Sequence, residues 1–185
     1  MKLLILFQIF LLIQNTYSQQ SQLSKTVNHI SDYIASEGFI HLRNEIGDVS
    51  AADSIFIIAT SFTNGNISDA LLALMFATVP YREVPIQIPL INSIVNYPLT
   101  SAEEEIFLKK NENLPRYLFF DTPQNNYGDK DKLAHFFGSA FLSYESHLFD
   151  MGKLIGYFVE AFEESFKVQS SVDIRDLDVN DFGRL

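Results

Sequence analysis

The apolar and polar positions alternate in a way that predicts helices over most of the chain. After residue 19, four apolar side chains recur at intervals of four, three and four, which is the stripe of an amphipathic helix. They are Leu23, Val27, Ile30 and Ile34. We expect Gly38 to stop this helix. The apolar run from Ala51 to Phe62 contains several isoleucines that suit a strand, but its length favours a helix.

Two further helices are expected before residue 111. The first runs from Asp69 to Val79, with Asn66 or Ser68 as its N-cap and Pro80 as its stop. The second follows the sequence Ser101-Ala102-Glu103-Glu104, which has the form of a capping box, and ends near Lys110.

The middle of the chain has a different character. Prolines at three places between Tyr81 and Leu99, interleaved with β-branched residues, exclude a helix and predict an extended ribbon or β-hairpin. Its turn is expected near Asn92 and Ser93. Residues 116–120 are predicted to be extended, and residues 121–128 form a turn-rich loop.

The last third of the chain is rich in phenylalanine and predicts three more helices, over residues 130–149, 152–167 and 172–182. The expected fold class is therefore mainly α, with a small extended ribbon or β-hairpin in the middle. We expect a single helical domain over residues 19–185, with its polar motifs in residues 129–185.

The first 18 residues have the form of a secretory signal peptide. Lys2 precedes a short apolar run, and small residues at Thr16 and Ser18 predict cleavage before Gln19. The chain contains no cysteine, so neither a disulfide nor a lipidated N-terminal cysteine is expected. The sequence thus predicts an exported protein that is periplasmic or secreted in a bacterium.

Charge limits the partners that the protein is expected to have. The 13 Lys and Arg residues face 23 Asp and Glu residues, which gives a net charge of −10. This sign opposes binding to nucleic acid or to an anionic lipid surface. No segment after the signal peptide has 18 uninterrupted apolar residues, so a spanning helix is not expected, although aromatic-rich helices could contact a membrane interface.

Ionisable residues in the C-terminal apolar segments are the strongest candidates for a site. Asp131 and His135 are four residues apart and share a helix face beside Lys132. Glu160 lies in the next predicted helix, and Asp176 and Asn180 form another pair at the same spacing in the last predicted helix. Because an isolated buried charge is costly, we expect these side chains to form a shared polar cluster. Gly156, four residues before Glu160, would let that helix approach closely.

Three interpretations of this cluster stay open. In the first, Asp131, His135, Glu160 and Asp176 bind a divalent metal ion. In the second, His135 and Glu160 act as an acid and base pair. In the third, the cluster is structural: Asp131 caps its helix, Lys132 pairs with Glu160 or Asp176, and His135 donates to a carboxylate.

The same residues resemble the pattern of the VanZ-like proteins and of related uncharacterised bacterial proteins described as periplasmic lipoproteins. The resemblance covers Asp129 to Gly183, with D-K-x-x-H at residues 131–135 and D-x-x-x-N-x-x-G at residues 176–183. Glu163 stands where the family usually has Gln. The helices are also more polar than those of the membrane-embedded family members. The chain ends at Leu185, where family members continue into another helix, so a truncated version of the family pattern is one expectation.

This resemblance implies a helical envelope protein of largely undefined biochemistry, in a family of which some members are linked to low-level resistance to glycopeptide antibiotics. It implies a shared polar signature at six positions of this chain. These are Asp131, Lys132, His135, Glu160, Asp176 and Asn180. The leading hypothesis is a non-enzymatic envelope protein with an unknown envelope component as its partner. The alternative is a metal-dependent or acid/base hydrolase that acts on an envelope component.

Overall fold

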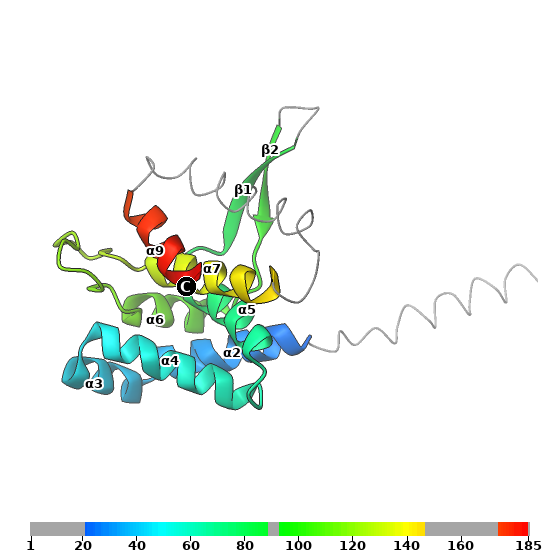
Figure 1. Cartoon of the computed structure of the whole chain (residues 1–185). Coiled ribbons are helices and arrows are strands. Elements are labelled where there is room, and N and C mark those ends of the chain that lie inside the picture. Colours follow the sequence, from blue (N-terminus) through cyan, green and yellow to red (C-terminus); the bar gives the residue numbers. More distant parts are fainter. Residues whose placement is uncertain (1–20, 89–92, 147–173, 185) are drawn as a thin grey trace, which may run out of the picture.

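The structure is a computed structural model that describes residues 21–88, 93–146 and 174–184. These residues form seven helices and one two-stranded antiparallel hairpin (Figure 1), which confirms the predicted mainly α fold with a small ribbon in the middle. The predicted signal peptide and the predicted helix over residues 152–167 lie outside the described residues.

From α2 to α6 the elements follow one another with short connections, and a longer loop precedes α7. Their bounds are α2 Gln22–Ala35, α3 Glu37–Ile46, α4 Asp48–Phe62, α5 Ile67–Thr78, β1 Glu83–Ile88, β2 Ser93–Pro98, α6 Glu104–Asn113, α7 Lys132–Ser146 and α9 Ile174–Arg184. The connection between α6 and α7 includes the turn-rich loop predicted at residues 121–128, and no strand forms at residues 116–120.

Helix α2 buries the predicted apolar stripe, and Val27, Ile30 and Ile34 are each 0% exposed. The prediction that Gly38 ends this helix is wrong. Helix α2 ends at Ala35, and the hydroxyl of the following Ser36 accepts a hydrogen bond from the backbone N–H of Phe39 at 3.1 Å. Serine is a favoured N-cap, so Ser36 starts α3 and Gly38 lies inside that helix.

Helix α5 begins as predicted and helix α6 does not. The side chain of Asn66 accepts from the backbone N–H of Asp69 at 3.2 Å, and α5 ends just before Pro80. The predicted capping box before α6 is wrong, because the N-cap is Glu103, which makes no side-chain cap. Ser101 lies two positions too early to reach the free amides of the first turn.

Polar side chains of α6 hold the C-terminal ends of two other helices. The backbone carbonyls at helix C-termini lack partners within their own helix. The Nζ atom of Lys110 donates to the carbonyl of Val79 after α5 at 2.5 Å, and the amide of Asn113 donates to the carbonyl of Ile34 near the end of α2 at 2.9 Å. Helix α6 therefore fixes α2 and α5 relative to each other.

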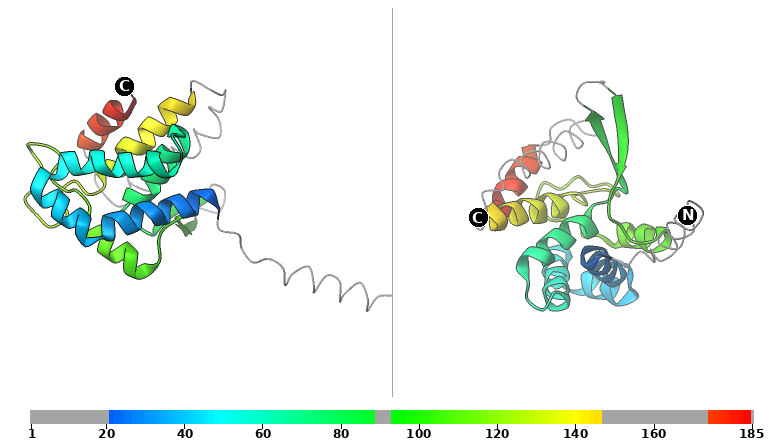
Figure 2. Two further views of the ribbon diagram at one scale, coloured as in Figure 1. Left: turned by 90° about the horizontal axis from the view of Figure 1, so that it is seen from below. Right: turned by 90° about the vertical axis from the view of Figure 1, so that its right-hand side faces the viewer.

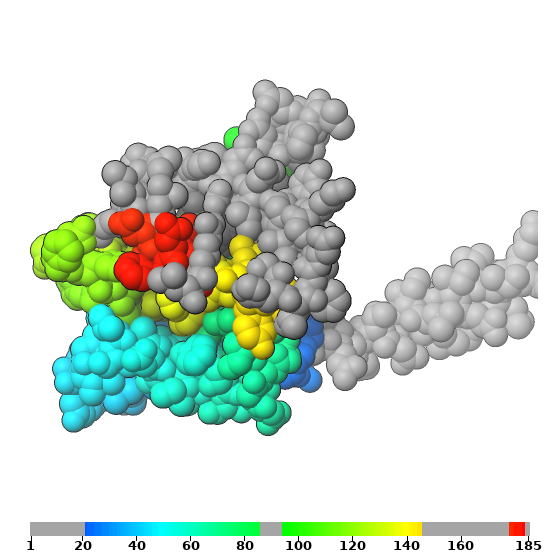
Figure 3. Space-filling model, viewed as in Figure 1, coloured from blue at the N-terminus to red at the C-terminus, as the bar shows by residue number. Residues whose placement is uncertain are grey.

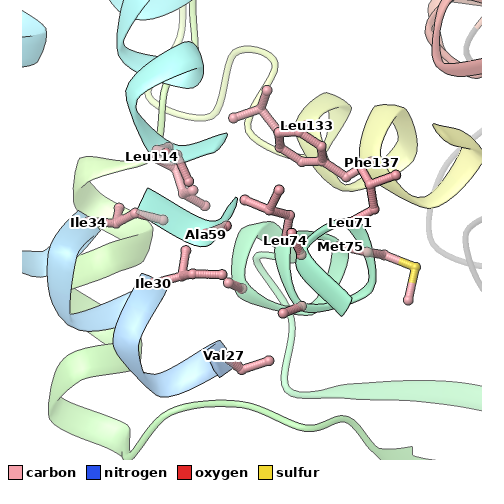
Figure 4. Packing of buried hydrophobic residues seen from close by; sticks show 14 of the residues in the cluster. Val27, Ile30, Ile34, Ala59, Leu71, Leu74, Met75, Leu114, Leu133 and Phe137 are labelled. Atoms are coloured by element: carbon pink, nitrogen blue, oxygen red, sulfur yellow. The ribbon is translucent and has the colours of Figure 1, made fainter. Parts of the chain in front are cut away.

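The apolar core lies between α2, α4, α5 and α7. Figure 4 shows Leu133 and Phe137 of α7 close to Leu71 and Leu74 of α5, and all four belong to one buried cluster. A methyl group added at Gly138 of α7 would lie 3.1 Å from the sulfur atom of Met75 in α5. The small residue thus lets α7 approach α5 closely. Helix α7, which holds the candidate site, is therefore packed directly against the N-terminal helices.

The hairpin extends away from the helices, as two views at right angles show (Figures 1 and 2). Its register pairs Glu83 with Pro98 at the base and Ile88 with Ser93 at the far end of the described strands. The predicted hairpin is confirmed, but its predicted turn near residues 92 and 93 lies too late in the sequence, because Ser93 already belongs to β2 and pairs with Ile88. Residues 89–92 at the turn lie outside the described residues.

Candidate polar centre at helix α7

The loop before α7 is built around Asp129, which is 0% exposed. Its carboxylate accepts hydrogen bonds from the backbone N–H of Leu118, at 3.3 Å, and from the hydroxyl of Thr122. Its own N–H donates to the carbonyl of Arg116 at 2.9 Å. At the preceding position, Gly128 has φ +58°, and an added Cβ atom would collide with that same carbonyl. These contacts fix the point at which α7 begins.

Three ionisable side chains are buried together at the start of α7. The exposed fractions are 8% for Asp131, 3% for Lys132 and 6% for His135. The Nζ atom of Lys132 lies 3.3 Å from each carboxylate oxygen of Asp131. Asp131 directly precedes α7, and its backbone carbonyl accepts a hydrogen bond from the N–H of His135 at 3.3 Å, so it stands where the sequence expects a cap, while its carboxylate contacts Lys132.

Helix α7 has two different faces. Leu133 and Phe137 lie on the face that packs into the core. Asp131, His135 and Ser139 follow one another at intervals of four, so they form a polar stripe along another face. Ser139 is 8% exposed, so this stripe is buried over two helical turns although its residues are polar. Burial of polar groups is costly unless they find partners.

Helix α9 supplies one of these partners. The hydroxyl of Ser139 donates to the side-chain oxygen of Asn180 at 2.9 Å. Near the end of α9, an added Cβ atom at Gly183 would collide with the carbonyl of Phe136 and would lie 3.1 Å from the backbone nitrogen of Ala140. The two helices pack together, and α9 lies beside α7 in Figures 1 and 3. The structure thus places Asn180 beside Ser139 at the end of the polar stripe.

The other predicted members of the cluster are described only in part. Asp176 lies in α9, one turn before Asn180, but its side chain is outside the description, as is Glu160 altogether. Within the described ranges, no three His, Cys, Asp or Glu side chains are grouped so that they could hold a metal ion. A metal site formed by Asp131, His135, Glu160 and Asp176 therefore stays a prediction, and so does an acid and base pair of His135 and Glu160.

Two further ionisable residues, Asp129 and Lys110, are buried although the sequence pattern did not single them out. Asp129 carried a signal, since it opens the run Asp-Lys-Asp-Lys immediately after a glycine in a turn, but the local pattern did not show what its carboxylate would bond. Lys110 lies three residues after the buried Phe107, on the apolar stripe of α6, and this position could have indicated burial. Its Nζ atom lies 4.7 Å from the centroid of the Phe107 ring, and burial lowers the pKa of Lys110 to about 7.

Comparison of the chain with family models, with curated proteins and with solved structures found no match. Over residues 21–88, 93–146 and 174–184, no helix combines the length and the apolar character needed to cross a bilayer.

Proposed function

We propose that this chain is an exported bacterial envelope protein, periplasmic or secreted, in which the C-terminal polar cluster has a structural role and the partner is another envelope component. The observation that supports this proposal is the joint burial of Asp131, Lys132 and His135 at the point where α7 meets the preceding loop. The resemblance to the VanZ-like pattern supports the same envelope setting.

The contacts around α7 favour a structural cluster over a hydrolase. A catalytic carboxylate needs free lone pairs and a route for substrate. The carboxylate of Asp131 is engaged by Lys132, and Asn180 of α9 bonds to Ser139 on the same stripe. The competing proposal, a metal-dependent or acid/base hydrolase, requires Glu160 and Asp176 to complete a site that is open to substrate.

The test of the cluster compares matched pairs of variants in metal-free buffer. His135→Ala is compared with His41→Ala, whose side chain is 85% exposed. Removal of one member of a buried polar cluster costs about 3 to 5 kcal/mol of unfolding free energy, whereas an exposed substitution changes it by about 0.5 kcal/mol or less. Urea denaturation followed by circular dichroism measures both, and Glu160→Gln against Glu163→Gln extends the comparison to the second helix.

Metal analysis separates the two proposals. Protein purified from its native compartment is analysed for divalent metals by mass spectrometry. The structural proposal expects no stoichiometric metal. A metal ion that is present at one equivalent and is lost in both His135→Ala and Glu160→Gln would overturn it in favour of a metal site.

Export is tested separately. A C-terminally tagged protein is isolated from cell fractions, and its N-terminal peptide is identified by mass spectrometry. We expect a chain that begins at Gln19 in the periplasmic or medium fraction. An intact Met1 in the cytoplasmic fraction would contradict export while leaving the structural role of the cluster unaffected.

A further inference from the structure

Helix α6 binds the connection that leads from α5 into the hairpin, residues 79–82. The Nζ atom of Lys110 donates to the carbonyl of Val79 at 2.5 Å. The side-chain amide of the next residue, Asn111, donates to the carbonyl of Pro80 at 3.0 Å. Because α6 itself follows the hairpin in the chain, these two bonds join the segments before and after the hairpin (Figure 1). We call the two bonds the hairpin clamp.

Both side chains of the hairpin clamp contain a buried polar group whose bonding is incomplete. Lys110 is 1% exposed, and among the residues that the structure describes no carboxylate forms an ion pair with it. The side-chain oxygen of Asn111 is buried and accepts no hydrogen bond within the same residues. Such groups are costly when water cannot reach them. Opening of the clamp brings water to both groups, so it costs less than the opening of a fully bonded contact.

The charged and titratable side chains on the neighbouring elements lie at the surface. Helix α6 packs against α2, and Lys110 contacts the residue that follows α5. The exposed side chains of this kind are Lys25, His29 and Asp32 of α2, Asp69 of α5, Arg82 and Glu83 at the base of the hairpin, and Glu104, Glu105, Lys109 and Glu112 of α6. The hydroxyls of Tyr33 and Tyr81 bond to those of Ser54 and Tyr127. Burial is therefore the cause that lowers the pKa of Lys110.

Helix α6 can move without disruption of the apolar core. The buried core cluster of the described residues includes no side chain of α6. Phe107 of α6 is buried outside that cluster, and the ammonium of Lys110 lies 4.7 Å from the centroid of its ring. A region with few contacts to the core opens at a lower free energy than the whole domain. The part of α6 around Lys110 is thus able to open by itself.

We propose that protonation of Lys110 opens the hairpin clamp while the apolar core stays folded, so that pH controls how firmly the base of the hairpin is held. In the closed clamp the apolar surroundings favour the neutral amine, and in the open clamp water favours the ammonium. Between the two pKa values each opening takes up a proton, so the clamp opens more often as the pH falls. Below the lower pKa value both forms are protonated, and the opening constant no longer changes.

Amide hydrogen exchange of the full protein, measured by mass spectrometry at about pH 7, 8 and 9, tests the proposal. Protection factors are compared, because they remove the effect of pH on the exchange chemistry itself. With a pKa of about 7 in the closed clamp and 10.5 in the open clamp, the opening constant of residues 79–85 and 99–110 should be about fiftyfold larger at pH 7 than at pH 9. These residues should exchange before α4, and their exchange should not depend on low concentrations of urea, as for a local opening.

Two substitutions fix the charge at position 110. Lys110→Arg stays charged at every pH and Lys110→Met is never charged, so both should lose the dependence of the protection factors on pH. Lys109→Met is the matched control and should keep it, because Lys109 is exposed and pairs with Glu105.

Three results would overturn the proposal. In the wild type, they are exchange of the clamp residues only together with α4, or equal protection of these residues at about pH 7 and pH 9. In the variant, it is a Lys110→Met protein that keeps the dependence on pH of the wild type. The first two results need no variant, so the test stands even if a substitution at position 110 prevents folding.

Discussion

Lys110 is expected to make the stability of this protein rise with pH above neutrality. Its side chain is 1% exposed, and its ammonium group donates to the carbonyl of Val79 and lies over the ring of Phe107. Within the described part of the chain, no carboxylate forms an ion pair with it. The guanidinium of Arg82 lies over the same ring, 5.5 Å from its centroid, and pairs with Glu104 at 4.0 Å.

The sign of the effect follows from proton binding. Burial lowers the pKa of Lys110 in the folded protein from 10.5 to about 7. Between these values the unfolded chain holds a proton that the folded chain has released, so the free energy of unfolding rises with pH. Below about pH 7 both states are protonated and the unfavourable contribution is constant, while above about pH 10.5 both states are neutral and it is gone.

The magnitude follows from the same two values. One pH unit between them is worth about 1.4 kcal/mol. The range from about 7 to 10.5 therefore corresponds to a total of about 5 kcal/mol, of which about 2 kcal/mol falls between about pH 7 and pH 9, because at pH 7 the folded group is still half protonated. This is a large part of the 5 to 15 kcal/mol that is typical of a folded domain.

The assay compares the wild-type protein with Lys110→Met by urea denaturation at about pH 7, 8 and 9. Methionine leaves the carbonyl of Val79 without its donor, which adds an offset of about 1 to 3 kcal/mol that does not depend on pH. The change of stability with pH is therefore the quantity to compare, and the wild type should gain about 1 kcal/mol per pH unit relative to the variant. Lys109→Met is the control, because Lys109 is exposed and pairs with Glu105 at 2.8 Å. Parallel profiles for wild type and Lys110→Met would refute the reasoning.

Three other substitutions test the contacts that position α7 and α9, each by urea denaturation. Gly183→Ala should lower the unfolding free energy by about 1 to 3 kcal/mol, because the added methyl group would collide with the backbone of α7. Gly38→Ala should raise it by about 0.5 kcal/mol, because the atom nearest to the added methyl group is 3.8 Å away. Equal effects of the two substitutions would contradict the close approach of α9 to α7. Asp129→Ala should cost about 3 kcal/mol because it removes the acceptor of the Leu118 amide and one of the partners of the buried Thr122 hydroxyl. The exposed Asp121→Ala should change stability by less than about 0.5 kcal/mol. Asp48→Ala should cost about as much as Asp129→Ala, since Asp48 accepts two backbone amides of the loop at 2.8 Å each, and a loss below about 1 kcal/mol would show that they find other partners.

The hydrophobic pattern alone determined the class of the fold. The stripe on α2, the cap at Asn66 and the prolines of the hairpin each act over a few neighbouring residues, so their consequences can be derived from the sequence. The shared face of Asp131, His135 and Ser139 was predictable for the same reason, because the spacing of four residues is a property of any helix. Two predictions from local sequence were wrong. Helices α2 and α3 are separated by Ser36 and not by Gly38, and Ser101 lies too early in the sequence to cap α6.

The partners of the buried polar groups were decided only by the tertiary structure. The sequence predicted that Asn180 joins the α7 stripe, but the bond to Ser139 depends on how closely Gly183 lets α9 approach α7. Asp129 and Lys110 find their partners 11 and 31 residues away along the chain, at Leu118 and Val79. Such pairings depend on how whole elements dock, because a buried charge is stable only where packing brings a donor or acceptor within hydrogen-bonding distance. No spacing within a single segment contains that information.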